Sequence, residues 1–158
     1  MHPSLRTVFC PLIASCALMV WGAAFADRRP ADSIPSADLI QPAALAAILR
    51  GEAAGKPVIL HVGFRTLYEQ AHIPAAEYTG PASEGQGLKR LRGLAAKLSK
   101  DADIVVYCGC CPWDNCPNVA DAYFALHDLG FTRVRVLYVP NNFGHDWAEK
   151  GYPVVKGS

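Results

Sequence analysis

Four cysteines lie close together in the middle of the chain, in the run Tyr-Cys-Gly-Cys-Cys-Pro-Trp-Asp-Asn-Cys-Pro-Asn-Val at 107–119. The apolar run at 104–107 predicts a strand before them, and the run at 117–129 predicts a helix after them. A helix N-terminus offers unpaired N–H groups and partial positive charge, and both favour a thiolate. We therefore expect a reactive thiol site in this loop, with a lowered cysteine pKa.

Cys108 is the candidate catalytic nucleophile, because it is the first residue after the expected strand and the N–H groups of the loop can converge on its sulfur. An inert buried cysteine is the alternative. Cys110, Cys111 and Cys116 are candidate resolving or auxiliary thiols, and structural pairing among them is also open. The other residues of the candidate active loop are Gly109, Pro112, Trp113, Asp114 and Asn115.

Three side chains near this loop have two interpretations each. Trp113 either covers the site and excludes water or only packs the loop. Asp114 could act on a proton, although capping the helix at 117–129 is the better interpretation. His61 lies near the end of the run at 58–62 and is a candidate pocket residue, with an ordinary buried histidine as the favoured alternative.

The four thiols could also bind a soft metal ion such as Cu(I), which accepts a compact set of sulfur ligands. Their spacing, C-x-C-C-x4-C, lacks the paired C-x-x-C pattern of a zinc ribbon. We predict a reaction that needs neither a metal nor a cofactor, and we keep the soft-metal module as an alternative.

The start of the chain predicts export. Residues 7–23 are almost wholly apolar and lead to an Ala-Phe-Ala sequence at 24–26. This pattern is typical of a signal peptide over residues 1–26, cleaved after Ala26, and predicts a location such as the bacterial periplasm. A retained membrane anchor and lipidation at Cys16 are less favoured alternatives. After cleavage we expect no membrane association.

The composition bounds the remaining possibilities. The chain has 158 residues, of which 51% are hydrophobic, so one domain with an ordinary core is expected. The formal net charge is +1 and no run of Lys or Arg occurs, so the sequence has no electrostatic footprint for nucleic acid.

Strands and helices are predicted to alternate. The expected strands are 39–40, 58–62, 76–78, 104–107 and 134–138, and the expected helices are 42–50, 66–71, 88–98, 117–129 and 143–150. Alternation predicts an α/β domain whose parallel sheet is flanked by helices, with reactive groups beyond the carboxyl ends of the strands. A loop is expected at 79–87. The polar segment 27–38 is expected to be a flexible lead before a domain at 39–155.

Three segments resemble the rhodanese family of sulfurtransferases. Residues 61–76 are similar to D-V-R-x-x-x-E-Y-x-x-G-H-I-P-G-A, residues 105–108 to the strand that delivers the family's persulfide-forming cysteine, and residues 147–154 to W-x-x-x-G-[LYF]-P-V. The resemblance implies a rhodanese-like domain and a persulfide on Cys108. It also implies a thiosulfate-like or mercaptan donor and a thiol or protein acceptor.

The sequence departs from the family pattern where a donor would bind. His61 stands where the family usually has Asp, and Gly63 where it usually has Arg. The loop is longer than the common C-x-x-x-x-R form, has no arginine and carries three more cysteines. A thiol-redox or sulfur-carrier module therefore remains an alternative. A phosphatase or arsenate reductase is weaker, because oxyanion binding favours an arginine that residues 108–118 lack.

Overall fold

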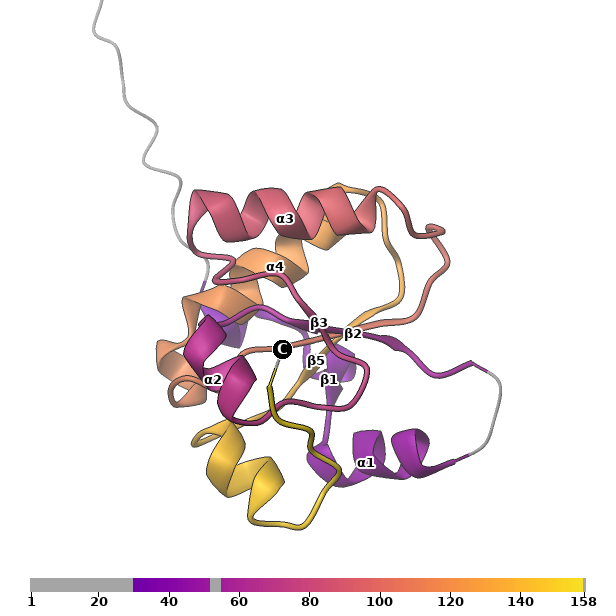
Figure 1. Cartoon of the computed structure of the whole chain (residues 1–158). Coiled ribbons are helices and arrows are strands. Elements are labelled where there is room, and N and C mark those ends of the chain that lie inside the picture. Colours follow the sequence, from indigo (N-terminus) through magenta and orange to yellow (C-terminus); the bar gives the residue numbers. More distant parts are fainter. Residues whose placement is uncertain (1–29, 52–54, 158) are drawn as a thin grey trace, which may run out of the picture.

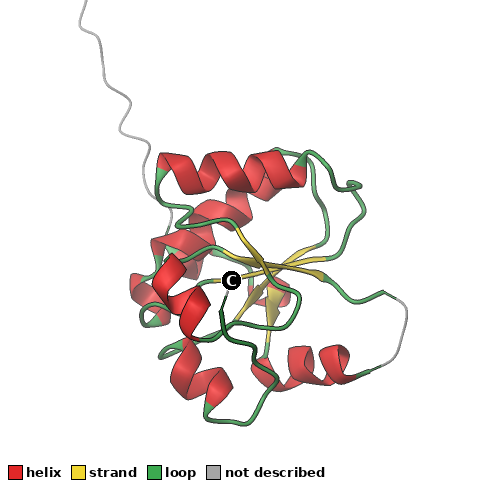
Figure 2. Cartoon of the chain, in the orientation of Figure 1, coloured by secondary structure: helices red, strands yellow, loops and turns green. Residues whose placement is uncertain are grey.

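A computed structural model describes residues 30–51 and 55–157. Its centre is a five-stranded sheet in the order β1-β5-β4-β2-β3, with every neighbouring pair parallel (Figures 1 and 2). The strands are β1 (Leu39–Ile40), β2 (Val58–His61), β3 (Glu77–Tyr78), β4 (Ile104–Tyr107) and β5 (Val134–Leu137). This confirms the predicted fold class, a single α/β domain with a parallel sheet flanked by helices.

Helices cover both faces of the sheet. The helices are α1 (Pro42–Arg50), α2 (Arg65–Gln70), α3 (Gly85–Ala95) and α4 (Pro117–Asp128), and the short turns are η1 (Ala31–Ser33), η2 (Ser36–Asp38), η3 (Trp113–Asn115) and the π-helical η4 (Gly144–Ala148). Figure 1 shows α3 and α4 on one face, and α1, α2 and the C-terminal η4 on the other. Proline at the first position of α1 and of α4 suits a helix start.

The central strand β4 divides the core in two. Its side chains alternate, so Ile104 and Val106 pack beneath α3 and α4, whereas Val105 and Tyr107 pack on the opposite face. All four are fully buried, as expected of a parallel strand covered on both faces. The next residue, Cys108, belongs to the core beneath α3 and α4.

The helix α3 differs from the expected helix at 88–98. It begins at Gly85, inside the predicted loop 79–87, and ends at Ala95. One of the two glycines in its first turn is required because the helix approaches the preceding loop closely: a Cβ on Gly87 would lie 1.9 Å from the carbonyl oxygen of Pro81. The low helix propensity of glycine led to the prediction of a loop here, although close packing on Pro81 requires glycine in this first helical turn.

The predicted flexible lead at 27–38 is wrong for residues 30–38. These residues form η1 and η2, and Ala31 and Ile34 are buried in the core beneath α4. Two apolar residues in a polar segment are enough to attach it to the domain. Residues 27–29 lie outside the described part of the chain.

The predicted signal peptide at 1–26, with its cleavage site and Cys16, also lies outside the described residues. Within residues 30–51 and 55–157, no helix has the length and apolar character needed to cross a membrane.

Candidate active site

Cys108 follows β4 directly, at the carboxyl edge of the sheet, and is only 2% exposed. The chain turns sharply at Gly109, which has a φ of +80°. The backbone N–H of Phe143 donates to the Gly109 carbonyl at 3.2 Å, and a Cβ on Gly109 would lie 2.4 Å from the Cβ of Phe143. A side chain at 109 would therefore both strain the turn and displace Phe143.

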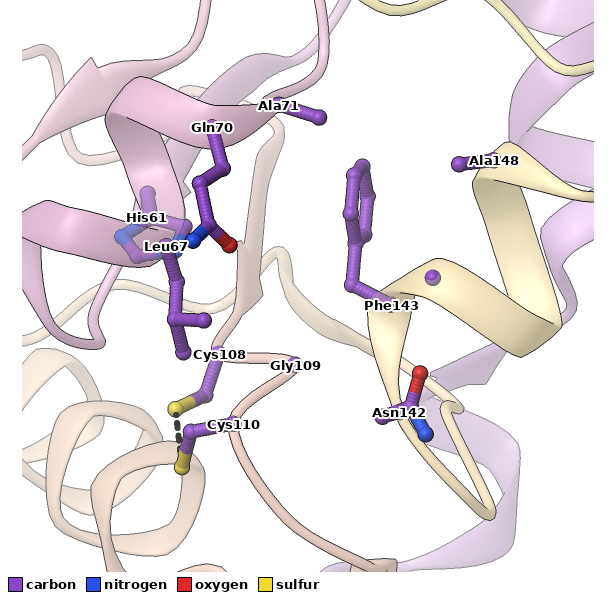
Figure 3. A pocket seen from close by; sticks show the side chains of 11 residues that line it. His61, Leu67, Gln70, Ala71, Cys108, Gly109, Cys110, Asn142, Phe143 and Ala148 are labelled. Carbon is purple, nitrogen blue, oxygen red and sulfur yellow. Dashed lines mark hydrogen bonds between the residues drawn. The ribbon is translucent and has the colours of Figure 1, made fainter.

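The turn brings three of the four thiols together. The Cys108 thiol donates to the Cys110 sulfur at 3.1 Å, as the dashed line in Figure 3 marks. The sulfurs of Cys108, Cys110 and Cys116 all lie within 4.8 Å of one another. Cys111 stands beside them, with its sulfur 2.9 Å from that of Cys110 and 3.5 Å from the Asn115 carbonyl oxygen. All four thiols are free.

The prediction of a lowered cysteine pKa is wrong for this reduced state. The hydrogen bond that Cys108 donates to Cys110 stabilises the thiol and, together with burial, raises the pKa of Cys108 to about 12. Contacts with the Cys116 thiol and with the backbone N–H of Cys110 lower the pKa of Cys108, but by less than the hydrogen bond to Cys110 and burial raise it.

The other thiols are protonated for related reasons. The pKa of Cys116 is raised chiefly by its hydrogen bond with Cys108, and burial raises the pKa of Cys111 to about 11. The bond from Cys108 lowers the pKa of Cys110, but the contact with Cys116 and burial raise it by more. Cys110 thus accepts a hydrogen bond from the Cys108 thiol, and this bond by itself favours the ionised form of Cys110.

Asn118 is a site residue that the sequence reasoning missed. It lies in the first turn of α4, is 2% exposed, and its Nδ2 donates to the Cys108 sulfur at 3.4 Å. Its Oδ1 accepts from the backbone N–H of Ser83 at 3.1 Å and from the Ser83 hydroxyl at 2.8 Å. These two bonds fix the amide so that its N–H points at sulfur. A polar residue in the first turn after the thiol loop was the available signal.

His61 ends β2 beside Cys108 and is 2% exposed. Register explains this placement, since His61 pairs with Tyr107, the residue before Cys108. Burial and, to a smaller extent, His72 lower the pKa of His61 to about 4, so the ring is neutral at physiological pH. Its Nδ1 accepts from the backbone N–H of Gly63 at 3.3 Å.

Gly63 leaves space next to the reactive sulfur. A Cβ at this position would lie 2.8 Å from the Cys108 sulfur and 3.1 Å from Cε1 of His61. Gly63 therefore adds no charge and leaves room at the sulfur.

A pocket of about 330 Å³ opens over Cys108. Leu67 and Gln70 of α2 line one side, and Asn142 and Phe143 line the other, as Figure 3 shows. None of its lining residues, all from the described part of the chain, is a Lys, Arg, Asp or Glu. Because His61 is neutral, the pocket carries no fixed charge and suits a molecule of low charge.

The other residues of the predicted loop either pack behind it or lie on the surface. Trp113 is 8% exposed, its ring packs on Tyr138 with centroids 5.1 Å apart, and its backbone N–H donates to the Pro140 carbonyl. It packs the loop from behind and is not among the residues that line the larger pocket. Pro112, Asp114 and Asn115 are exposed. The predicted helix cap at Asp114 is wrong, since Cys116 occupies the N-cap.

The raised pKa of Cys108 predicts a steep pH dependence. Its thiolate fraction should rise about tenfold per pH unit up to a midpoint well above 9, because only the ionised sulfur reacts. Cys110→Ala removes the hydrogen-bond acceptor and should lower that midpoint by roughly one unit. The rate of iodoacetamide labelling at Cys108, followed against pH by fragment-ion mass spectrometry, gives this midpoint. Cys111→Ala is the matched control and should leave the midpoint unchanged; an unshifted midpoint in Cys110→Ala would contradict this account.

The space at Gly63 gives a second prediction. Gly63→Ala places a methyl group against the Cys108 sulfur and should slow labelling of Cys108 by at least about tenfold, the effect of a modest steric barrier. Gly93→Ala is the control, because a Cβ there meets nothing within 4 Å and alanine favours the interior of α3. Equal labelling rates in the two variants, each checked by thermal unfolding, would show that the space is not used.

No family model and no curated protein matches this sequence. Solved structures do match. The rhodanese-like domain of the Alr3790 protein from Anabaena sp. has a TM-score of 0.57 and 24% identity, over 75% of this chain and 79% of that one. The BH2092 protein from Bacillus halodurans has a TM-score of 0.57 and 22% identity, over 74% and 75% of the two chains.

A third match is thiosulfate sulfurtransferase from Pseudomonas aeruginosa. It has a TM-score of 0.53 and 24% identity, over 76% of this chain and 19% of that longer chain. The parallel sheet, the cysteine loop at the end of β4 and these likenesses lead to one conclusion: this chain has the rhodanese-like fold.

Proposed function

We propose that the protein is a sulfurtransferase of rhodanese type in which Cys108 carries the sulfur as a persulfide. The observation that carries the proposal is the position of the Cys108 sulfur. It is a free thiol at the end of β4, at the base of a pocket and beside the space left by Gly63. The rhodanese-like fold supports the same assignment.

The proposed reaction has two transfers. The Cys108 thiolate attacks the outer sulfur of a donor, a new S–S bond forms, and the donor's bond to that sulfur breaks, so its leaving group departs with the electron pair. A thiolate acceptor then attacks the outer sulfur of the Cys108 persulfide and regenerates the Cys108 thiolate. The Asn118 amide N–H and the backbone N–H of Cys110 are the donors that would stabilise anionic sulfur at this position.

The pocket favours a donor of low charge. Thiosulfate is a dianion, and the lining residues offer no cation to offset its desolvation. An organic persulfide, R–S–SH, brings a smaller charge and an apolar group that Leu67 and Phe143 can contact. We therefore propose organic persulfides as the donor class and a thiol, small or on a protein, as the acceptor.

A second candidate function is a dithiol–disulfide cycle. The 3.1 Å contact between the sulfurs of Cys108 and Cys110 favours it, because two thiols at this separation need little movement to bond. In this cycle the two thiols pass two electrons and two protons to a disulfide oxidant, which becomes two thiols.

We also propose that either function is carried out by an exported protein. The support is the apolar segment at 7–23 and the Ala-Phe-Ala sequence at 24–26, which match a cleavable signal. The mass of the intact protein recovered from cells tests this, and a chain that begins at Asp27 is expected.

Sulfur loading tests the sulfurtransferase proposal. Reduced protein mixed with an alkyl persulfide should gain the mass of one sulfur atom, located on Cys108 by fragment ions, and thiosulfate should load it more slowly. Cys108→Ser should gain none, because serine at its ordinary pKa is a poor nucleophile. Cys116→Ser should load normally, since serine suits the N-cap of α4. If no donor adds sulfur to the reduced protein, or if the sulfur is found on Cys116, the assignment is wrong.

The redox candidate makes a different prediction. Free thiols counted across a series of dithiothreitol redox buffers should fall by two in one step, and Cys110→Ser should abolish that step while leaving sulfur loading on Cys108. Cys111→Ser is the control and should retain the step. Four free thiols under every buffer would exclude the cycle.

A further inference from the structure

The three thiols that meet in the loop have the composition and spacing of a ligand set. The sulfurs of Cys108, Cys110 and Cys116 lie within 4.8 Å of one another, and two of these residues are buried. We propose that these three sulfurs form a three-coordinate binding site for a soft monovalent cation, Cu(I). This inference goes beyond sulfur transfer and does not depend on it.

The donor set favours a soft ion. All three candidate ligands are sulfur, and no histidine or carboxylate belongs to this cluster within the described residues. Thiolates select soft and borderline ions such as Cu(I) and Zn²⁺, whereas carboxylate and carbonyl oxygen suit Mg²⁺ and Ca²⁺. The ligand types therefore exclude hard divalent cations from this position.

The number of ligands separates Cu(I) from Zn²⁺. A structural zinc site needs four protein ligands, and three-ligand zinc sites hold the ion with His or carboxylate and an open position. The fourth thiol, Cys111, contacts Cys110, with 2.9 Å between the two sulfurs, but it is not one of the three whose sulfurs lie within 4.8 Å of one another. Three sulfurs in mutual reach match trigonal coordination of a d¹⁰ monovalent ion.

The surroundings of the cluster can hold the negative charge of three thiolates around one Cu⁺. Asn118 donates to the Cys108 sulfur at 3.4 Å, and Cys116 is the N-cap of the twelve-residue α4. A helix N-terminus of this length stabilises anionic ligands. On the other side, the apolar side chains of Trp113, Val119, Leu137 and Val139 close the site from behind and limit the access of water.

Copper and sulfur would compete for one atom. Persulfide formation turns the Cys108 thiolate into a neutral inner sulfur, which is a much weaker metal ligand, so loading with sulfur should weaken the binding of copper. Binding requires the protons of the three thiols to leave, and the affinity should therefore rise with pH. The inference gives the extra cysteines of the loop a role that sulfur transfer on Cys108 alone does not require.

Anaerobic titration of the reduced protein with Cu(I), against the chromophoric chelator bathocuproine disulfonate, tests the site. One Cu(I) per chain should move from the chelator to the protein. Cys110→Ser and Cys116→Ser should each lower the affinity by at least about tenfold, since removal even of a group that only supports a metal ligand costs this much. Cys111→Ser is the control and should bind as the wild type does. Zn²⁺ in excess should not displace the copper.

Several outcomes would overturn the site. They are no transfer of copper from the chelator, equal loss in Cys111→Ser and Cys116→Ser, or displacement by Zn²⁺. Circular dichroism of each variant separates loss of a ligand from loss of fold, and the half-buried Cys110 provides a variant of low structural cost. Cys116→Ser also separates this inference from the proposed function, because that variant should load sulfur and fail to hold copper.

Discussion

The hydrogen bond from the Cys108 thiol to the Cys110 sulfur is the contact on which the chemistry of this loop depends. It exists because Gly109 turns the chain in the left-handed region directly after β4, so that residues two apart face each other. Glycine is required at 109 because its φ is positive and because Phe143 occupies the space that a side chain would take. A backbone constraint at one glycine thus places a second thiol against the Cys108 sulfur.

That contact keeps the Cys108 thiol protonated in the reduced site. A buried thiol that donates to another sulfur keeps its proton, and the pKa of Cys108 is raised accordingly. A persulfide is more acidic than its parent thiol, so loading the sulfur would convert the same environment from one that holds a proton to one that holds an anion. The Asn118 N–H, fixed by Ser83, is positioned to favour that anion.

The sequence predicted most of the fold because the relevant signals are local. Apolar runs between turns located the strands, and Pro117 and Gly130 bounded the helix after the thiol loop. Two features were missed because they depend on tertiary packing. The glycine-rich start of α3 has low helix propensity yet packs on Pro81, and Ile34 anchors a segment of polar composition. Neither contact has a signal at the scale of a few residues.

The site was predicted in outline, and its electrostatics were not. The position of Cys108 follows from the end of a strand, which periodicity locates. The sign of its pKa shift depends on which neighbours face the sulfur. The sequence prediction considered only the helix N-terminus, which lowers a cysteine pKa, and not the neighbouring thiols, which raise it. Asn118 was missed for the same reason: its amide is oriented toward the Cys108 sulfur by a bond to Ser83, which is far away in the sequence.

The missing arginine and the additional thiols are two aspects of one change. An arginine in such a loop would stabilise an anionic donor by fixed charge, whatever the state of the nucleophile. Here the pocket is neutral, and stabilisation of anionic sulfur comes from N–H donors and from sulfur itself. Sulfur neighbours are polarisable, can exchange bonds and can share a soft cation, none of which an arginine can do. A loop with sulfur neighbours and no arginine is therefore better suited to sulfur exchange and to a soft cation than to an oxyanion, and both proposed activities rest on that chemistry.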